Sequence, residues 1–205
     1  MTDKTLKKYH KQRAYDISHR EFDKGQVVLL GDCIIEHLPM KKYLNGKPFY
    51  NNGIEGDTTE LLEETLYKRA IKYKPSKCFI SIGSNDIGNN VGTVKMIYEN
   101  IVRIVKTLKR RSNKTKIYIV SVIPVNNSST SKCVSEKAQD RDNFDIKMLN
   151  YYLRNYARKH KIGYVDIANH LKNDYEQLNL EYTIDGFHLN EFGYDIYKKC
   201  IEQYV

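Results

Sequence analysis

Residues 77–83 read KCFISIG, and this stretch decides the fold. It is apolar almost throughout and ends in a glycine, a pattern typical of a strand buried on both faces of a parallel sheet. A stripe of apolar residues at helical spacing follows over 93–110, and a second apolar strand over 116–122 ends just before Pro124. A strand, a helix and another strand in this order predict a parallel pair joined by a helical crossover.

The same alternation extends over most of the 205 residues. Strands are predicted at 26–30, 49–52, 77–83, 116–122 and 163–167, and helices at 58–73, 93–110, 144–160 and 190–204. Because each right-handed crossover lays its helix on one face of the sheet, this order predicts a three-layer α/β/α sandwich with a five-stranded parallel sheet. Residues 2–23 carry only a weak helical pattern. The predicted organisation is therefore a helical arm over 1–24 and one domain over 25–205.

The charge of the chain does not indicate a nucleic-acid partner. There are 34 Lys and Arg against 25 Asp and Glu, which gives a net charge of +9. The basic residues are mostly scattered among acidic ones, without the basic stripe and stacking aromatics of a nucleic-acid binder. No nucleic acid is therefore expected among the partners, and the sequence does not indicate an oligomeric state.

The spacing of the cysteines and the length of the apolar runs indicate whether the chain has a metal site and where in the cell it is expected. Cys33, Cys78, Cys133 and Cys200 show no C-x-x-C spacing, so neither a zinc site nor a redox motif is indicated. Cys133 is expected in an exposed loop over 126–133, which is rich in Asn and Ser. No apolar run is long enough to span a membrane, and the start of the chain lacks the apolar core of a signal peptide. The expectation is a cytoplasmic protein without a metal or a membrane span.

Side chains with catalytic chemistry follow the ends of the predicted strands. Cys33 comes after the first strand, Gly53 after the second and Asn85 after the third, while Asp185 and His188 occupy a loop before the last helix. In open parallel sheets, ligands bind outside the carboxyl ends of the strands. The sequence therefore predicts that these residues meet at one edge of the sheet.

The residue types suit acyl transfer. Asp185 can orient the ring of His188, whose second nitrogen then serves as a base. Cys33 at the start of a helix, beside an imidazole, is expected to have a lowered thiol pKa and to act as a thiolate nucleophile. The N–H groups of Gly53 and Cys33 and the amide of Asn85 can donate to a developing oxyanion. Taken singly, the same residues also fit a buried space-filling thiol, a turn glycine and an Asx turn.

Four short blocks occur in order: GDC at 31–33, NGIEGDT at 52–58, GSND at 83–86 and DGFHLN at 185–190. Over about residues 25–204 the chain resembles the SGNH, or GDSL-type, hydrolases. This resemblance implies a flavodoxin-like sheet and an esterase or acylhydrolase that needs no cofactor. It also implies roles at the matching positions. Cys33 is the nucleophile and first oxyanion donor, and Gly53 and Asn85 are further oxyanion donors. His188 is the base, Asp185 orients it, and Asp32 and Asp86 are supporting residues.

Two segments narrow the implied substrate. The block at 52–58 and the segment SVIPVN at 121–126 resemble the branch with platelet-activating-factor acetylhydrolase-like and carbohydrate acetylesterase-like members. That likeness implies a short acyl group, acetyl first, on a small-molecule alcohol or a carbohydrate.

The chain departs from the family at the nucleophile, where the family has serine and this chain has Cys33. A thiol paired with His188 can attack esters and form a thioester that is then hydrolysed. Alternatively, sulfur misplaces the reacting atom, and the protein is an impaired, ligand-binding pseudoenzyme. A third alternative is a cysteine introduced by design into an active esterase. The residues leave these three alternatives open.

Overall fold

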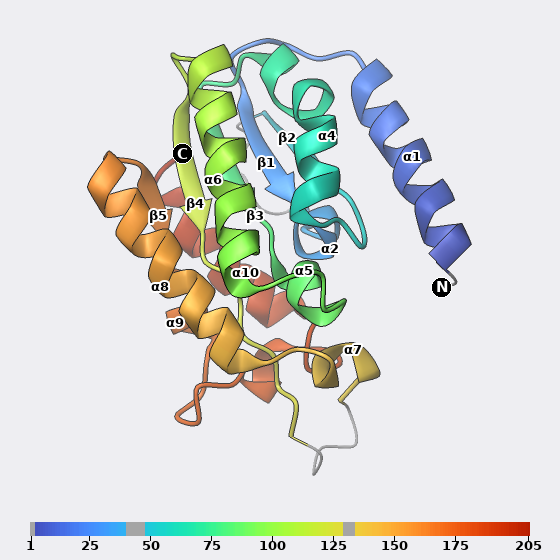
Figure 1. Cartoon of the computed structure of the whole chain (residues 1–205), viewed down its shortest axis with the longest axis vertical. Helices are drawn as coiled ribbons and strands as arrows, with labels where there is room; N and C mark the ends of the chain where they lie inside the picture. Colours follow the sequence, from blue (N-terminus) through green and yellow to red (C-terminus); the bar gives the residue numbers. More distant parts are fainter. Residues whose placement is uncertain (1–2, 40–47, 129–133) are drawn as a thin grey trace.

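The five predicted strands form one sheet in the computed structural model, which describes residues 3–39, 48–128 and 134–205 (Figure 1). All neighbouring strands are parallel, in the order β2-β1-β3-β4-β5. The strands are β1 (Val27–Gly31), β2 (Phe49–Gly53), β3 (Lys77–Ser81), β4 (Lys116–Val120) and β5 (Gly163–Val165). The predicted sheet is confirmed, with strand ends shifted by no more than two residues.

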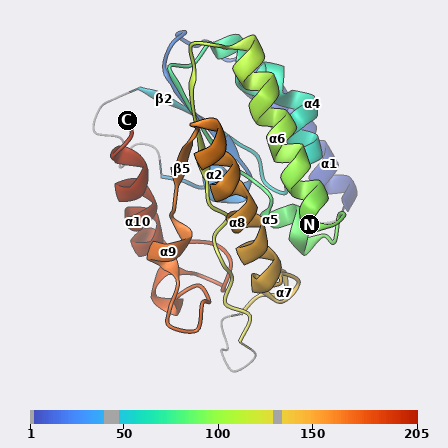
Figure 2. The ribbon, with the colours of Figure 1, turned by 60° about the vertical axis from the view of Figure 1, so that its left-hand side comes forward.

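Helices cover both faces of the sheet, as Figure 2 shows from the side. The helices α1, α4, α6 and α8 pack on one face, and α2, α9 and α10 pack on the other. Two 3-10 turns occur at Ile71–Tyr73 and Leu180–Tyr182. The helices are α1 (Asp3–His19), α2 (Cys33–Glu36), α4 (Thr59–Arg69), α5 (Ser84–Gly88), α6 (Val94–Arg111), α7 (Glu136–Gln139), α8 (Asn143–His160), α9 (Ala168–Leu171) and α10 (Glu191–Glu202). The three-layer sandwich is confirmed.

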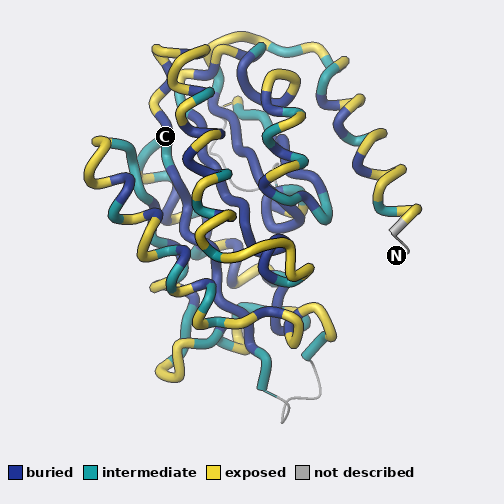
Figure 3. Tube along the Cα trace, viewed as in Figure 1, coloured by how far each residue is buried: buried dark blue, intermediate teal, exposed yellow. Residues whose placement is uncertain are grey.

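The central strands are buried from both sides, which explains why they are apolar without alternation. In β3, Cys78 and Ile80 face the core under α4 and α6, while Phe79 faces the core under α10. All three side chains are at most 1% exposed. Figure 3 shows the same pattern along the chain, with buried strands inside and exposed outer helix faces. Burial on both faces is the reason that parallel strands read as continuous apolar runs.

Polar side chains begin two of the helices of the larger core, α4 and α6. The hydroxyl of Thr58 accepts a hydrogen bond from the N–H of Leu61 at the start of α4, and Thr93 accepts one from Met96 at the start of α6. Such caps satisfy N–H groups that have no intrahelical partner.

Within the described ranges, no helix is both long and apolar enough to cross a membrane.

The N-terminal helix is attached to the sandwich by buried contacts. Ile17 of α1 is 1% exposed and belongs to the larger core, and its carbonyl accepts a hydrogen bond from the hydroxyl of Tyr73 at 2.6 Å. The division into an arm over 1–24 and a domain over 25–205 stays a prediction. The loop predicted over 126–133 is described only as far as Ser128, and the predicted exposure of Cys133 lies outside the described residues.

Candidate functional site

Sheet topology brings the predicted site residues to one edge. Strand β1 lies between β2 and β3, and Gly31 at its end pairs with Gly53 of β2 and Ser81 of β3. Cys33 begins the short helix α2 after β1, and Asn85 is the second residue of the short helix α5 after β3, so both lie at the same edge of the sheet.

The turn after β1 holds Cys33 in place. Asp32 caps the short helix α2, because its carboxylate accepts a hydrogen bond from the N–H of Ile34 at 3.0 Å. Cys33 is the first residue of that helix and is 1% exposed. The end of β2 presses against the same helix: a Cβ atom added to Gly53 would lie 2.3 Å from the backbone nitrogen of Glu36. Glycine at 53 is therefore required by the close approach of β2 to α2.

A tight loop before α10 builds the base. Nδ1 of His188 lies 2.8 Å from Oδ2 of Asp185, and Oδ1 of the same carboxylate accepts the backbone N–H of His188 at 2.7 Å. The hydroxyl of Thr183 closes the loop by donating to the carbonyl of His188 at 2.7 Å. Gly186 has a φ of +84°, and a Cβ there would lie 2.5 Å from the carbonyl oxygen of Asn126. The four residues Thr183, Asp185, Gly186 and His188 thus fix the imidazole in one orientation.

Asp185 remains ionised in this arrangement. Burial opposes the charge, but hydrogen bonds from the ring and the N–H of His188 and from the N–H of Phe187 outweigh burial and hold the pKa of Asp185 well below its ordinary value. An ionised partner keeps the proton of the ring on Nδ1, which leaves Nε2 free to accept one. A ring nitrogen of His188 and Sγ of Cys33 lie within 4.8 Å of each other, and Nε2 is buried without a hydrogen-bond partner among the described residues.

The predicted lowering of the Cys33 pKa is wrong. Burial raises the pKa of this thiol well above its ordinary value, and the nearby carboxylates of Asp32 and Glu55 raise it further. Lys137 and Arg141 act in the opposite direction with smaller effects. Desolvation penalises a charge more strongly than a four-residue helix stabilises it. Cys33 is therefore a neutral thiol in the resting protein, and an attack by its sulfur requires a base at the same moment.

This thiol gives a first testable prediction. The rate of alkylation of Cys33 by iodoacetamide should be low at neutral pH and should keep rising beyond about 8.5, the pKa of a free thiol, because the thiolate fraction grows only at higher pH. Peptide mapping by mass spectrometry measures the rate, with glutathione as the reference thiol. An alkylation rate that has already reached its plateau at neutral pH would contradict the claim that the Cys33 thiol is neutral in the resting protein.

Asn85 is held by two partners that determine its orientation. Its Nδ2 donates to the carbonyl of Asp57 at 3.0 Å, and its Oδ1 accepts from Arg141 at 2.8 Å. Arg141 can only donate, so the oxygen of the amide must face it and the nitrogen must face the other way. The second hydrogen of Nδ2 remains available to an oxyanion.

Arg141 was not apparent from the sequence. It is 4% exposed, donates to Oγ of Ser84 at 3.0 Å and stacks over the ring of Phe187 at 3.9 Å from the ring centroid. It therefore links the loop of Asn85 to the loop of His188. It stands in a mixed-charge stretch, 140–142, which carries no motif, so no sequence signal could have identified it.

The remaining predicted residues have partners within the protein. The N–H of Gly53 donates to Oδ1 of Asn51 at 3.0 Å, so its role as an oxyanion donor stays a prediction that requires this amide to turn away. Asp86 accepts the N–H of Thr59 at 3.1 Å and its hydroxyl at 2.5 Å, tying α5 to α4. Burial raises the pKa of Asp86 to about 6 and that of Asp32 to about 7. Both carboxyl groups thus lie within the framework around the site.

A cavity of about 420 Å³ opens beside the base. His188 lines it together with His37, Ile184, Leu189 and Tyr194. Aliphatic and aromatic walls of this kind suit the apolar part of a small ligand. The cavity provides space for a substrate beside His188.

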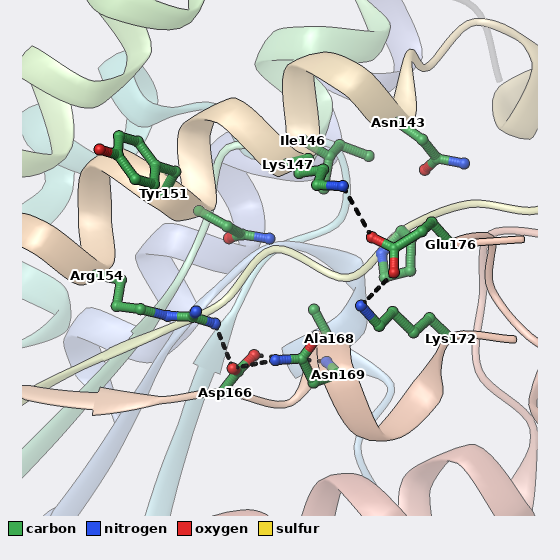
Figure 4. Close-up of a pocket in the computed structure, with 12 residues that line it drawn as sticks. Asn143, Ile146, Lys147, Tyr151, Arg154, Asp166, Ala168, Asn169, Lys172 and Glu176 are labelled. Atoms are coloured by element: carbon green, nitrogen blue, oxygen red, sulfur yellow. Dashed lines mark hydrogen bonds and ion pairs between the residues drawn. The ribbon is translucent and has the colours of Figure 1, made fainter. Parts of the chain in front are cut away.

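A second cavity, of about 390 Å³, lies between α8 and the segment after β5 (Figure 4). Its charged side chains are paired with one another: Arg154 with Asp166, and Lys147 and Lys172 with Glu176. The predicted nucleophile and base do not line it. The candidate site is therefore the cavity beside His188.

Comparisons with known proteins bear on the family of this chain. The model of the GDSL-like lipase/acylhydrolase family matches residues 21–196. The chain is 30% identical over 187 residues to the N-acylneuraminate cytidylyltransferase of Escherichia coli O18:K1:H7, an alignment that covers 90% of this chain and 42% of that protein. The protein of the same name from Streptococcus agalactiae serotype III is 24% identical over 203 residues, which cover 43% of it. The chain thus spans less than half the length of these curated relatives.

Solved structures show the same fold. A Streptococcus pneumoniae protein described as a candidate platelet activating factor is 28% identical, with a TM-score of 0.84 and coverage of 98% of this chain and 92% of that one. A GDSL-like lipase from Bacteroides thetaiotaomicron is 25% identical, with a TM-score of 0.79 and 95% of both chains covered. The resemblance predicted from the four blocks is confirmed. The chain belongs to the GDSL-like lipase/acylhydrolase family and is an enzyme of the esterase and acylhydrolase class.

Proposed function

We propose that the protein hydrolyses a short-chain acyl ester, an acetyl ester, of a carbohydrate, with Cys33 as nucleophile, His188 as base and Asp185 as its orienting partner. The observation that carries the proposal is the imidazole of His188, which is bound to Asp185 at 2.8 Å and has a buried, unpartnered Nε2 near the thiol of Cys33. This is the arrangement of a nucleophile, a base and an orienting carboxylate.

The reaction begins with a neutral thiol. Nε2 of His188 takes the proton of Cys33 while Sγ bonds to the carbonyl carbon, so the high pKa of the thiol is no obstacle to the attack. The N–H of Cys33 and the amide of Asn85 donate to the oxyanion that forms. When the intermediate collapses, the bond to the alcohol breaks, and the proton on His188 passes to the leaving oxygen. A water molecule, activated by the same nitrogen, then hydrolyses the thioester and releases the acid.

A carbohydrate substrate is supported by the relatives. Their name refers to N-acylneuraminate. The alignments with these two relatives cover 90% and 99% of this chain. The family model that matches this chain is that of a lipase/acylhydrolase, which supports ester hydrolysis rather than cytidylyl transfer. An O-acetylated N-acylneuraminate is therefore the first sugar ester to test.

The direct test measures acetate released from an O-acetylated N-acylneuraminate and from longer acyl esters of p-nitrophenol. The proposal predicts turnover of the acetyl esters and a steep loss with acyl length. Saturable binding of the sugar ester without any release of acetate would instead establish the ligand-binding pseudoenzyme. Turnover by Cys33→Ser alone would identify an esterase silenced at its nucleophile.

Asn85 gives a prediction specific to the oxyanion. Asn85→Ala should lower kcat by about 10²- to 10³-fold, the usual cost of one lost donor, with little change in KM. Asn89→Ala is the matched control, because Asn89 is exposed at the end of the same short helix, and its activity should equal that of the parent. Steady-state kinetics with p-nitrophenyl acetate measures both variants. Equal kcat in Asn85→Ala and the parent would exclude Asn85 from the oxyanion site.

A further inference from the structure

A carboxylate that ester hydrolysis does not require lies beside the thiol. Glu55 stands in the loop between β2 and α4, and its side chain is 15% exposed. One of its carboxylate oxygens, Sγ of Cys33 and a ring nitrogen of His188 all lie within 4.8 Å of one another. A negative charge here opposes the oxyanion that acyl transfer develops. The position of Glu55 therefore calls for a different explanation.

One nitrogen and one oxygen atom of this cluster are buried without a hydrogen-bond partner among the described residues. Nε2 of His188 and Oε2 of Glu55 are both buried and have no hydrogen-bond partner in the described part of the chain. The opposite atoms are held: Nδ1 of His188 by Asp185 at 2.8 Å and Oε1 of Glu55 by Lys137 at 3.0 Å. Each of these two side chains is thus held through one atom, while its second nitrogen or oxygen atom is buried without a hydrogen-bond partner, and one such atom of each residue lies within 4.8 Å of the sulfur of Cys33.

A thiolate, an imidazole and a carboxylate form a recognised set of ligands for zinc. Catalytic zinc sites have three protein ligands and an open fourth position. Bonds of about 2.0 to 2.3 Å place tetrahedral ligand atoms about 3.3 to 3.8 Å apart, so a bound ion must draw the three atoms together by about 1 Å. The contact from Asp185 to the back of the imidazole is the usual second-shell support of a metal-bound histidine.

The surroundings allow a dication to enter. Nε2 of His37 lies 3.7 Å from Oε2 of Glu55, and the ring centroids of His37 and His188 are 6.0 Å apart. The side chain of His37 is 53% exposed, so it stands at the mouth of the cluster and offers either a fourth ligand or a path for water. Binding of the ion displaces the proton of the Cys33 thiol to solvent, and the resulting thiolate and the carboxylate of Glu55 together balance the charge of one divalent ion.

We propose that Cys33, Glu55 and His188 bind one thiophilic divalent cation, with Zn²⁺ as the preferred ion, and that the bound ion blocks the nucleophile. The three residues lie on three separate segments, namely the start of α2, the loop between β2 and α4, and the loop before α10, so no spacing in the sequence indicates the site. Sulfur is the ligand that selects Zn²⁺ over harder cations. The cysteine at the nucleophile position thus couples a metal site to the hydrolase site: an occupied site holds both the nucleophile and the base.

Cobalt substitution tests the site without any assay of activity. The reduced, chelator-free chain is titrated with Co²⁺, and the thiolate-to-cobalt charge-transfer band and the ligand-field bands of a tetrahedral ion are recorded. One ion per chain should bind. The charge-transfer band should be absent in Cys33→Ser and retained in Cys200→Ser. No band in the parent, or an unchanged band in Cys33→Ser, would overturn the proposal.

Zinc affinity distinguishes the proposed metal ligands from Asp185, which only orients the imidazole of His188. It is measured by competition with a colorimetric chelator. Asp185→Asn should weaken Zn²⁺ binding by about 10- to 100-fold, as loss of a second-shell partner does, and Glu55→Gln should weaken it more. Circular dichroism confirms that each variant is folded. Unchanged affinity in Glu55→Gln would show that Glu55 is not a ligand and would overturn the three-residue site.

Inhibition is tested separately. Zn²⁺ should inhibit hydrolysis of p-nitrophenyl acetate by the parent, and it should inhibit Cys33→Ser at least tenfold less strongly, since serine is a poor ligand for this ion. Equal inhibition of both proteins would contradict the block at Cys33. If neither protein hydrolyses the ester, the proposed function fails, while the cobalt spectrum still decides the metal site.

Discussion

His188→Asn should lower kcat/KM for acetyl esters by about 10²- to 10⁴-fold, the usual contribution of a general base. The effect should be at the upper end of that range, because the resting thiol of Cys33 is neutral: burial and the carboxylates of Asp32 and Glu55 raise its pKa well above the ordinary value. Without a base, attack depends on the small fraction of thiolate. The measurement is steady-state kinetics at neutral pH.

Two further variants make this prediction specific. Asp185→Asn removes the ionised partner that Nδ1 of His188 contacts at 2.8 Å, so it should also lower kcat, because the ring then loses its fixed tautomer. His170→Asn is the matched control, since His170 is exposed on α9. Raising the pH should partly restore the activity of His188→Asn, because more thiolate forms. A His188→Asn protein with the activity of the His170→Asn control would exclude His188 as the base.

Arg69→Met should destabilise the fold by about 3–5 kcal/mol, the cost of leaving a buried charge without its partner. Arg69 and Asp57 are both fully buried, and Nη1 of the arginine lies 2.5 Å from Oδ2 of the aspartate. The guanidinium also donates to the carbonyls of Asn52 at 2.7 Å and Gly31 at 3.0 Å. Its loss therefore leaves Asp57 with the ring of His10, at 2.9 Å, as its remaining side-chain partner among the described residues. It also removes the donor to two carbonyl groups at the ends of β1 and β2.

A surface pair provides the matched control. Arg103 bonds Glu63 at 3.0 Å, but its side chain is 52% exposed, so Arg103→Met should cost less than about 1 kcal/mol. Urea unfolding measures both variants, and a change in midpoint at constant slope reports stability alone. If Arg69→Met unfolds at the same urea concentration as Arg103→Met, the buried pair does not hold the ends of β1 and β2 together.

The strands and the site blocks were predictable because their signals are local. Each strand is a continuous apolar run, and in a parallel sheet the run ends where the site begins, so Cys33, Gly53 and Asn85 could be assigned to one edge. The Asp185 and His188 pair is local as well, since one loop closed by Thr183 holds both. The catalytic roles of Cys33, His188 and Asp185 are proposed on the basis of this geometry.

The contacts that could not be predicted join residues far apart in the chain. Arg141 binds Asn85 across 56 positions, and Glu55 meets Cys33 and His188 only in the folded chain. The pKa of Cys33 was predicted in the wrong direction for the same reason. The sequence shows the helix start and the distant imidazole, whereas the burial and the two carboxylates that raise the pKa of the thiol appear only in the folded structure.

The most direct test of the account is the mass of the intact protein after brief exposure to p-nitrophenyl acetate in the presence of a metal chelator. One acetyl group should appear and then decay as the thioester is hydrolysed, and peptide mapping should place it on Cys33. The adduct should form equally in Cys200→Ser and be absent in Cys33→Ala. An adduct that persists in Cys33→Ala, or turnover without any dependence on Cys33, would contradict the claim that this thiol is the nucleophile.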